Sequence, residues 1–239
     1  MFSVNKKTLA VFAVSLACTL TLLIIFSAYL YHVQVRPRLN LIVVVDAGHG
    51  GVDGGTTGIA TGVRESDLNL MIAQELRAYF EGGGLTVVMT RLDEGGLYGT
   101  ATPGYKRRDM QMRARIIDES TPDLVVSIHL NKYSSSSRSG AQVFFKQSDE
   151  YGKRAAALMQ GFLNTGVNTR NYSALKGDYY ILNCSSYPSV IVEGGFLSNP
   201  DDEAKLLTES YRKSLAYYIY CGAIAFLAEQ SGQVFEQSV

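Results

Sequence analysis

Two histidines of this 239-residue chain stand where apolar runs end, and both are candidates for metal binding. His49 follows the run in VVVDAGHGG, and His129 closes the run LVVSIH. In open α/β sheets, ligands bind beyond the carboxyl ends of the strands, so two histidines at two such ends can converge on one metal ion. His32, the third histidine, ends a long apolar segment, and we expect no catalytic role for it.

Carboxylates near His49 offer a third ligand. A catalytic zinc ion usually has three protein ligands, and two histidines with one carboxylate are a common set. The candidates are Asp46 at the end of the apolar run, Asp53 in a glycine-rich loop, and Glu65 just before a helix expected to begin near Ser66. Each also has a purely structural explanation. Asp46 can bond to the glycine-rich turn, Asp53 can be a solvated turn residue, and Glu65 can provide a favourable charge at a helix N-terminus. The residues alone leave this choice open.

Glu193 is a candidate general base. It follows the apolar run SVIV and precedes two glycines, a position that packing explains poorly. A carboxylate there can take a proton from a metal-activated water, although it can also pair with an arginine or cap a turn. Rival chemistries lack their motifs: the loop GHGGVDGG fits neither GxxxxGK[ST] nor GxGxxG, and the sequence contains no HExxH or GxSxG.

The elements that must position these residues alternate between strands and helices. Apolar runs predict strands over 41–45, 85–90, 124–129, 141–146, 179–182 and 190–192. Helical spacing predicts helices over 68–80, 109–120, 150–163 and 201–229, the last as one helix or a pair. In the second of these helices, Met112, Ile116 and Ile117 are expected to face inward. This alternation indicates an α/β fold with a mostly parallel central sheet flanked by helices.

Charge is distributed unevenly along the chain, which indicates a membrane anchor before the α/β domain. No charged residue lies between Lys7 and Arg36, and a helix of about 20 apolar residues spans a bilayer. We therefore expect an uncleaved transmembrane anchor over 1–35, a linker over 36–40, a catalytic domain over 41–230 and a tail over 231–239.

The composition also excludes some partners and frameworks. Lys6 and Lys7 precede the apolar stretch, so the part of the chain that follows it has 20 of the 22 basic residues and all 22 acidic ones. Its slightly negative net charge gives no electrostatic reason to expect nucleic-acid binding. Three cysteines without a CxxC motif predict no disulfide framework.

Five motifs occur in order over about residues 41–228: VVVDAGHGGVDGG, RESDLNL, VMTR, LVVSIHLN and VIVEGGFLSNPDDEAKL. Together they resemble the zinc-dependent N-acetylmuramoyl-L-alanine amidases of the Amidase_3 family. The resemblance implies one zinc ion held by His49, Glu65 and His129, with Glu193 as the catalytic glutamate. It also implies cleavage of the amide between the lactyl group of N-acetylmuramic acid and the L-alanine of the stem peptide. One departure, SIHLN for the common SIHAN, places Leu130 beside a predicted ligand.

Two further stretches, KRRDMQMRARIIDE and DYYILNCSSYPSVIVEGGFLSNP, resemble the germination-specific amidases of spore-forming bacteria. That resemblance implies a membrane-anchored enzyme with an extracytoplasmic catalytic domain, in the forespore intermembrane space. Its substrate would be spore-cortex peptidoglycan, in a step towards muramic-δ-lactam.

The sequence contains no segment suited to autoinhibition. The segment 92–106 is short and glycine-rich, which leaves no room for an inhibitory helix, so control is expected from location, expression timing or a regulatory protein partner. The alternatives are a non-catalytic peptidoglycan-binding protein on the same fold and a membrane-attached nucleotide-binding domain. The presence of all four predicted site residues argues against the former, and the failed glycine-loop patterns argue against the latter.

Overall fold

The computed structural model describes residues 6–34 and 40–236, which belong to two compact units with the boundary between residues 39 and 40. The first unit contains one helix, α1 (Lys6–Gln34), over the predicted anchor. Among the residues described, no helix is both long and apolar enough to cross a membrane, so the transmembrane part of the prediction lacks structural support. Except for Asn40, the predicted linker lies outside the described residues, as do residues 237–239 of the predicted tail.

The second unit is built on a single six-stranded sheet with the strand order β2-β1-β3-β6-β4-β5. The strands are β1 (Ile42–Ala47), β2 (Thr86–Met89), β3 (Leu124–Asn131), β4 (Gln142–Phe145), β5 (Leu175–Lys176) and β6 (Ser189–Phe196). Only the pairing of β4 with β6 is antiparallel. The predicted mostly parallel sheet is therefore confirmed.

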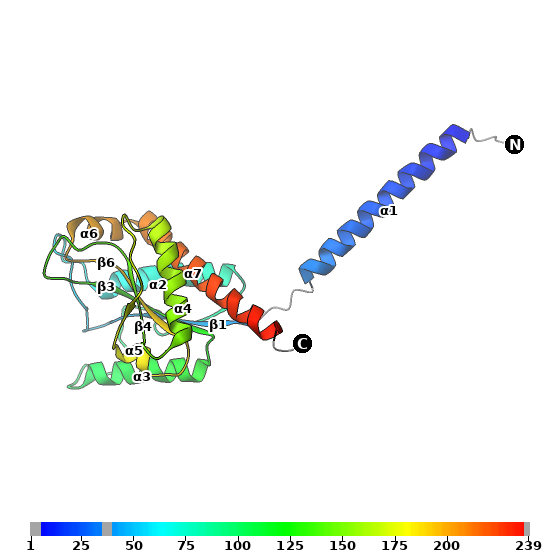
Figure 1. Cartoon of the computed structure of the whole chain (residues 1–239). Helices are drawn as coiled ribbons and strands as arrows, with labels where there is room; N and C mark the ends of the chain where they lie inside the picture. The colour runs from blue at the N-terminus through cyan, green and yellow to red at the C-terminus, as the bar shows by residue number, and fades with distance from the viewer. Residues whose placement is uncertain (1–5, 35–39, 237–239) are drawn as a thin grey trace. The chain divides into compact units, whose positions relative to one another are not determined.

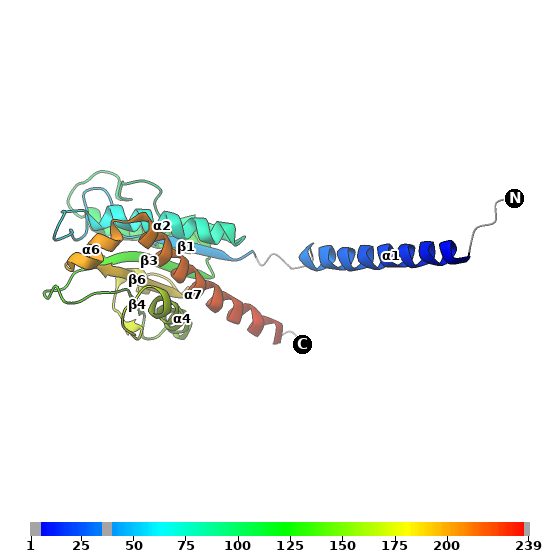
Figure 2. The same ribbon diagram turned by 90° about the horizontal axis from the view of Figure 1, so that it is seen from above.

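Helices cover both faces of this sheet. They are α2 (Glu65–Gly82), α3 (Tyr105–Ser120), α4 (Glu150–Gly166), α5 (Tyr180–Asn183), α6 (Pro200–Leu206) and α7 (Glu209–Glu236). Helices α2, α4 and α7 pack on one face, and α3 and α5 lie on the other (Figures 1 and 2). Because α6 and α7 are separate, the predicted C-terminal helical region is a pair.

Strand β1 shows why the central strands appear in the sequence as continuous apolar runs. Val43 and Val45 are buried in the larger core, with α2, α4 and α7, whereas Val44 is buried in the smaller core, with α3 and α5. Successive side chains of a strand point to opposite faces, so a strand covered on both sides has apolar residues facing both cores and not only at alternate positions. No disulfide adds to this core, because Cys18, Cys184 and Cys221 are all free.

The predicted strand over 179–182 is wrong: Tyr180–Asn183 forms the short helix α5. Ile181 and Leu182 are buried in the smaller core, while Tyr180 is 51% exposed. A short apolar run has the same composition in a buried strand and in a single helical turn, so periodicity does not separate the two.

The predicted inward face of α3 is partly wrong as well. Ile117 is fully buried, but Met112 is 39% exposed. The face turned to the sheet consists of Asp109, Arg113 and Ile117, which are spaced four residues apart. Two of these three residues are charged, and an apolar pattern therefore missed the buried face of this helix.

Candidate metal centre

His49 lies in the loop directly after β1 and adopts a left-handed backbone conformation, with φ of 62°. Such a conformation is uncommon outside glycine and is often found at functional sites. The neighbouring Gly48 lies against the His129 ring, where an added Cβ would sit 2.3 Å from ring atoms Cε1 and Nε2. Only glycine allows the two histidine-bearing segments to approach this closely.

Glu65 is the first residue of α2, which begins after Arg64 and one residue before Ser66, near which the sequence predicted its start. Its side chain is 5% exposed and its carboxylate accepts several hydrogen bonds. Oε2 accepts one from the Thr56 amide at 2.8 Å, and Oε1 accepts one from the Leu130 amide at 3.2 Å. The start of the helix therefore aims this carboxylate at the end of β3.

The two histidines meet at the same oxygen. Glu65 Oε1 lies 3.0 Å from His129 Nδ1 and 3.3 Å from His49 Nε2. The donor atoms of these residues all lie within 4.8 Å of one another. Two imidazole nitrogens and one carboxylate are the donor set of a three-ligand zinc site with an open position, so these residues fit a zinc ion. The structure brings all three predicted ligands together, while their role as ligands stays a prediction.

The other two carboxylate candidates lie elsewhere. Asp46 is buried and accepts hydrogen bonds from Arg113, Thr90 and Ser127, at 2.5, 2.7 and 2.5 Å respectively. Asp53 lies on the far side of the His49 ring, where its Oδ2 is 3.0 Å from Nδ1. A carboxylate in that position orients a metal-ligating imidazole through its second nitrogen.

Negative charge dominates this cluster. Burial alone would lower the pKa of His49, but Glu65 and Asp53 raise the pKa to about 9. Burial alone would raise the pKa of Glu65, yet the two imidazoles hold it well below its usual range. The negative carboxylates that favour a proton on His49 also attract a divalent cation. The electrostatics of the cluster therefore suits a metal centre.

Glu193 lies on β6, in register with His129 on the neighbouring strand β3. It is 8% exposed, and its Oε2 has no hydrogen-bond partner among the residues that the structure describes. Burial raises the pKa of this carboxyl to about 7, with Glu65 adding to the rise and the histidines opposing it. A carboxyl with a pKa near neutrality beside the ligand cluster is suited to accept and return a proton.

A cavity of about 230 Å³ opens beside the cluster and is lined by His49, His129, Tyr179, Tyr180 and Lys106, among others. Sequence reasoning did not identify Lys106, whose Nζ lies 3.2 Å from Asp53 Oδ1. Lys106 lies 57 residues after His49 and 23 residues before His129, so no motif spacing points to it.

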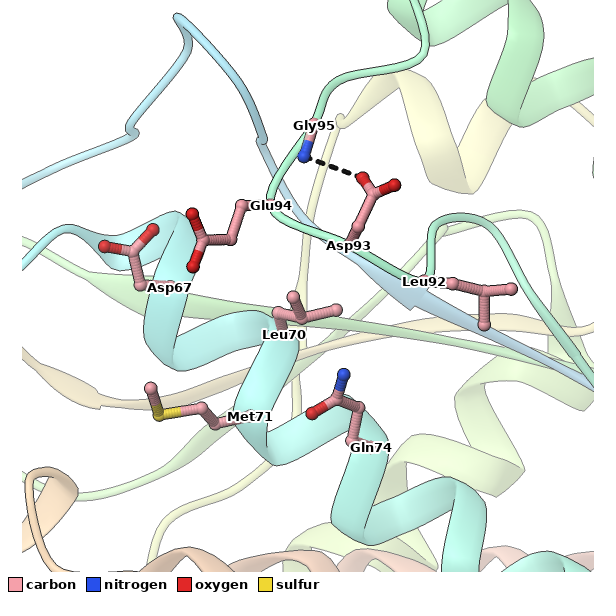
Figure 3. A pocket seen from close by; sticks show the side chains of 8 residues that line it. All are labelled: Asp67, Leu70, Met71, Gln74, Leu92, Asp93, Glu94 and Gly95. Carbon is pink, nitrogen blue, oxygen red and sulfur yellow. Dashed lines mark hydrogen bonds between the residues drawn. The ribbon is translucent and has the colours of Figure 1, made fainter.

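A larger cavity, of about 740 Å³, lies between α2 and the loop after β2 (Figure 3). Its lining combines the carboxylates of Asp67, Asp93 and Glu94 with apolar side chains such as Leu70 and Met71. None of the four predicted site residues lines it, so the predicted chemistry belongs to the smaller cavity.

Comparison with known proteins identifies the family. The family model for N-acetylmuramoyl-L-alanine amidase, Amidase_3, matches residues 43–225. The chain belongs to the Amidase_3 family. The germination-specific N-acetylmuramoyl-L-alanine amidase of Bacillus subtilis is 34% identical over 199 residues, which cover 81% of this chain and 83% of that relative.

Solved amidase structures agree with this assignment. The CwlD amidase from Clostridioides difficile, solved in complex with the GerS lipoprotein, matches with a TM-score of 0.75 and 34% identity, over 79% of this chain and 99% of that one. An N-acetylmuramoyl-L-alanine amidase from Clostridium difficile 630 gives 0.70 and 28%, over 79% and 97%. The predicted enzyme class, N-acetylmuramoyl-L-alanine amidase, is confirmed.

Proposed function

We propose that this amidase is zinc-dependent, with His49, Glu65 and His129 holding one ion and Glu193 transferring the proton. The observation that carries the proposal is the convergence of two imidazole nitrogens, from His49 and His129, on Glu65 Oε1. Glu193 lies in register beside His129. A bound zinc ion supplies polarisation of the scissile carbonyl and lowers the pKa of a water molecule towards about 7. Glu193 takes a proton from the attacking water and returns it to the departing L-alanine nitrogen.

A glutamate-to-glutamine exchange tests the role of Glu193. Glu193→Gln keeps the shape of the side chain but removes the base, so we expect full zinc content and a loss of turnover on purified peptidoglycan of at least about 100-fold. The matched control is Glu119→Gln, because the Glu119 side chain is 63% exposed on α3. Turnover of Glu193→Gln within a few-fold of wild type would remove this residue from the mechanism.

Zinc content, measured by elemental analysis, tests the ligands independently of activity. We expect one equivalent in the wild-type protein and a large loss in His49→Ala and in His129→Ala. A full equivalent in both variants would place the metal elsewhere. Loss of amidase activity with a chelator, and its return with zinc, would exclude the alternative of a non-catalytic peptidoglycan-binding protein.

We further propose that the substrate is spore-cortex peptidoglycan and that the product leads to muramic-δ-lactam. Support comes from the Bacillus subtilis relative, whose name describes it as germination-specific. The test is mass analysis of cortex muropeptides from a strain that lacks this protein. Absence of muramic-δ-lactam supports the proposal, whereas intact lactam leaves only the general amidase.

Helix α1 is proposed to tether the enzyme to a membrane, with the catalytic unit on the extracytoplasmic side. The support is the uncharged stretch between Lys7 and Arg36, most of which lies in α1. In vegetative cells made to express the chain, protease added outside intact protoplasts should digest the catalytic unit of a tethered enzyme. Complete protection, or recovery in the soluble fraction, would contradict this arrangement.

We also propose that a protein partner binds and regulates this amidase. The related CwlD amidase from Clostridioides difficile was solved in complex with the GerS lipoprotein, which supports a partner for this chain as well. Among the described residues no helix lies between β2 and α3, the region in which the sequence predicts no inhibitory helix. Purification of the tagged full-length protein from sporulating cells should recover a stoichiometric partner, and its absence would count against this proposal.

A further inference from the structure

The main chain around His49 is held by two buried arginines. Arg91 Nε and Arg113 Nη1 both donate to the Ala47 carbonyl, each at 2.8 Å. Arg91 Nη2 donates to the Gly48 carbonyl at 3.1 Å, and Arg113 Nη2 donates to the His49 carbonyl at 2.6 Å. Three consecutive carbonyls that end at a predicted ligand therefore face guanidinium groups.

Arg91 differs from Arg113 in what balances its charge. Arg113 forms ion pairs with Asp46 and Asp109, at 2.5 and 2.7 Å. Arg91 is 3% exposed, yet no carboxylate oxygen within the described part of the chain comes within 4.0 Å of it. Its donors reach main-chain carbonyls, and the carboxylates that attract its charge, those of Asp46, Asp109 and Asp67, form no direct ion pair with it, whereas a buried charge is normally paired directly. Its position therefore needs another explanation.

The carbonyls that Arg91 holds belong to the segments that carry two predicted ligands. Nη2 joins Gly48 O, next to His49, to Ser66 O, next to Glu65, at 3.1 and 2.7 Å. Nη1 donates to Asp93 O at 2.8 Å, in the loop that runs beside the first turns of α2 in Figure 3. One planar guanidinium thus connects the end of β1, the first turn of α2 and the loop after β2.

We propose that Arg91 is a positioning residue that fixes the spacing between His49 and Glu65 and thereby sets the affinity of the centre for zinc. This inference rests on the proposed zinc-dependent function. Arginine suits the task because its five N–H donors form a rigid fork, whereas lysine offers a single point charge on a flexible stem. Loss of residues that orient metal ligands typically weakens metal binding by about 10- to 100-fold.

The test compares zinc affinity in full-length variants, measured by competition with a chromophoric chelator. Arg91→Lys should raise the zinc dissociation constant by at least about 10-fold. Amidase activity of this variant should recover as free zinc is raised. The neutral variant Arg91→Gln, which avoids burying an ammonium group, should show the same weakening. Far-UV circular dichroism and thermal unfolding of the metal-free proteins report whether each variant folds.

Arg108 provides a matched control. It also donates to main-chain carbonyls, those of Tyr98, Thr100 and Pro103, at 3.3, 2.8 and 3.1 Å, but that loop carries no predicted ligand. Arg108→Lys should therefore bind zinc with wild-type affinity.

Three outcomes would overturn the assignment of Arg91. They are a dissociation constant of Arg91→Lys within twofold of wild type, equal weakening in Arg108→Lys, and failure of both Arg91 variants to fold. The variant His49→Ala distinguishes failure of the Arg91 proposal from failure of the proposed zinc-dependent function. If the wild-type protein binds zinc no better than His49→Ala, both the zinc site and the role of Arg91 are wrong. If wild type binds zinc and His49→Ala does not, the result for Arg91 stands on its own.

Discussion

Asp46 is a buried acid whose charge is stabilised only in the folded state, which predicts a dependence of stability on pH. Burial alone would raise its pKa, but Arg113, Ser127 and Thr90 outweigh burial and lower the pKa to about 2, from the ordinary 3.8. Because the folded pKa is the lower one, this stabilisation is complete above about pH 4 and is lost as the pH falls through about 2. It amounts to about 2 kcal/mol.

Urea unfolding of wild type and Asp46→Asn at several pH values checks this expectation. Asp46→Asn leaves Arg113 with one ionic partner, so we expect it to be less stable than wild type at pH 7 by about 3 kcal/mol. The difference should shrink between pH 4 and pH 2. A difference that is independent of pH would mean that the Asp46 carboxylate is not the titrating group.

The residues of the site divide into those that sequence can reveal and those that it cannot. His49, His129 and Glu193 follow apolar runs, and a polar side chain at a strand end is visible in the sequence. The choice of Glu65 over Asp46 and Asp53 needed the family resemblance. Because charged side chains are mostly solvated, no pattern marks Arg91 or Arg113 as buried, and only the folded chain shows what they hold.

At the scale of elements, helix α3 offers a test of which face is buried. Ile117 is fully buried in the smaller core, whereas Met112 is 39% exposed on the same helix. Ile117→Ala should lower the free energy of unfolding by about 2–5 kcal/mol, because it leaves a cavity. Met112→Ala should change it by no more than about 0.5 kcal/mol. Chemical denaturation of both variants measures the two effects, and equal losses would contradict the observed orientation of α3.

Strands were easier to predict than this helix for a physical reason. β1, β3 and β6 are covered on both faces, so most of their positions are apolar and each apolar run is nearly continuous. Helix α3 buries the Asp109–Arg113 ion pair, so the period of its apolar residues does not follow its buried face. Helix α5 is too short for any period to be visible.

At the scale of the molecule, the two compact units predict that residues 40–239 fold without the preceding helix. Both buried cores consist of residues from the second unit only, as far as the structure describes the chain. Removal of residues 1–39 should leave the unfolding temperature within about 2 °C of the full-length value, a shift that corresponds to no more than about 1 kcal/mol. Turnover on soluble peptidoglycan fragments should also stay unchanged, because every predicted site residue is retained.

The same truncation separates catalysis from location. If α1 acts as a tether, the shortened enzyme should leave the membrane fraction and lose activity towards wall polymer in cells while keeping it in solution, because a tether raises the effective concentration of enzyme at its substrate. The full-length Glu193→Gln variant is the matched control, since it should stay in the membrane fraction without turnover. A truncated protein that unfolds at a markedly lower temperature would show that the first unit contributes to the fold, and retention in the membrane fraction would assign membrane attachment to the catalytic unit itself.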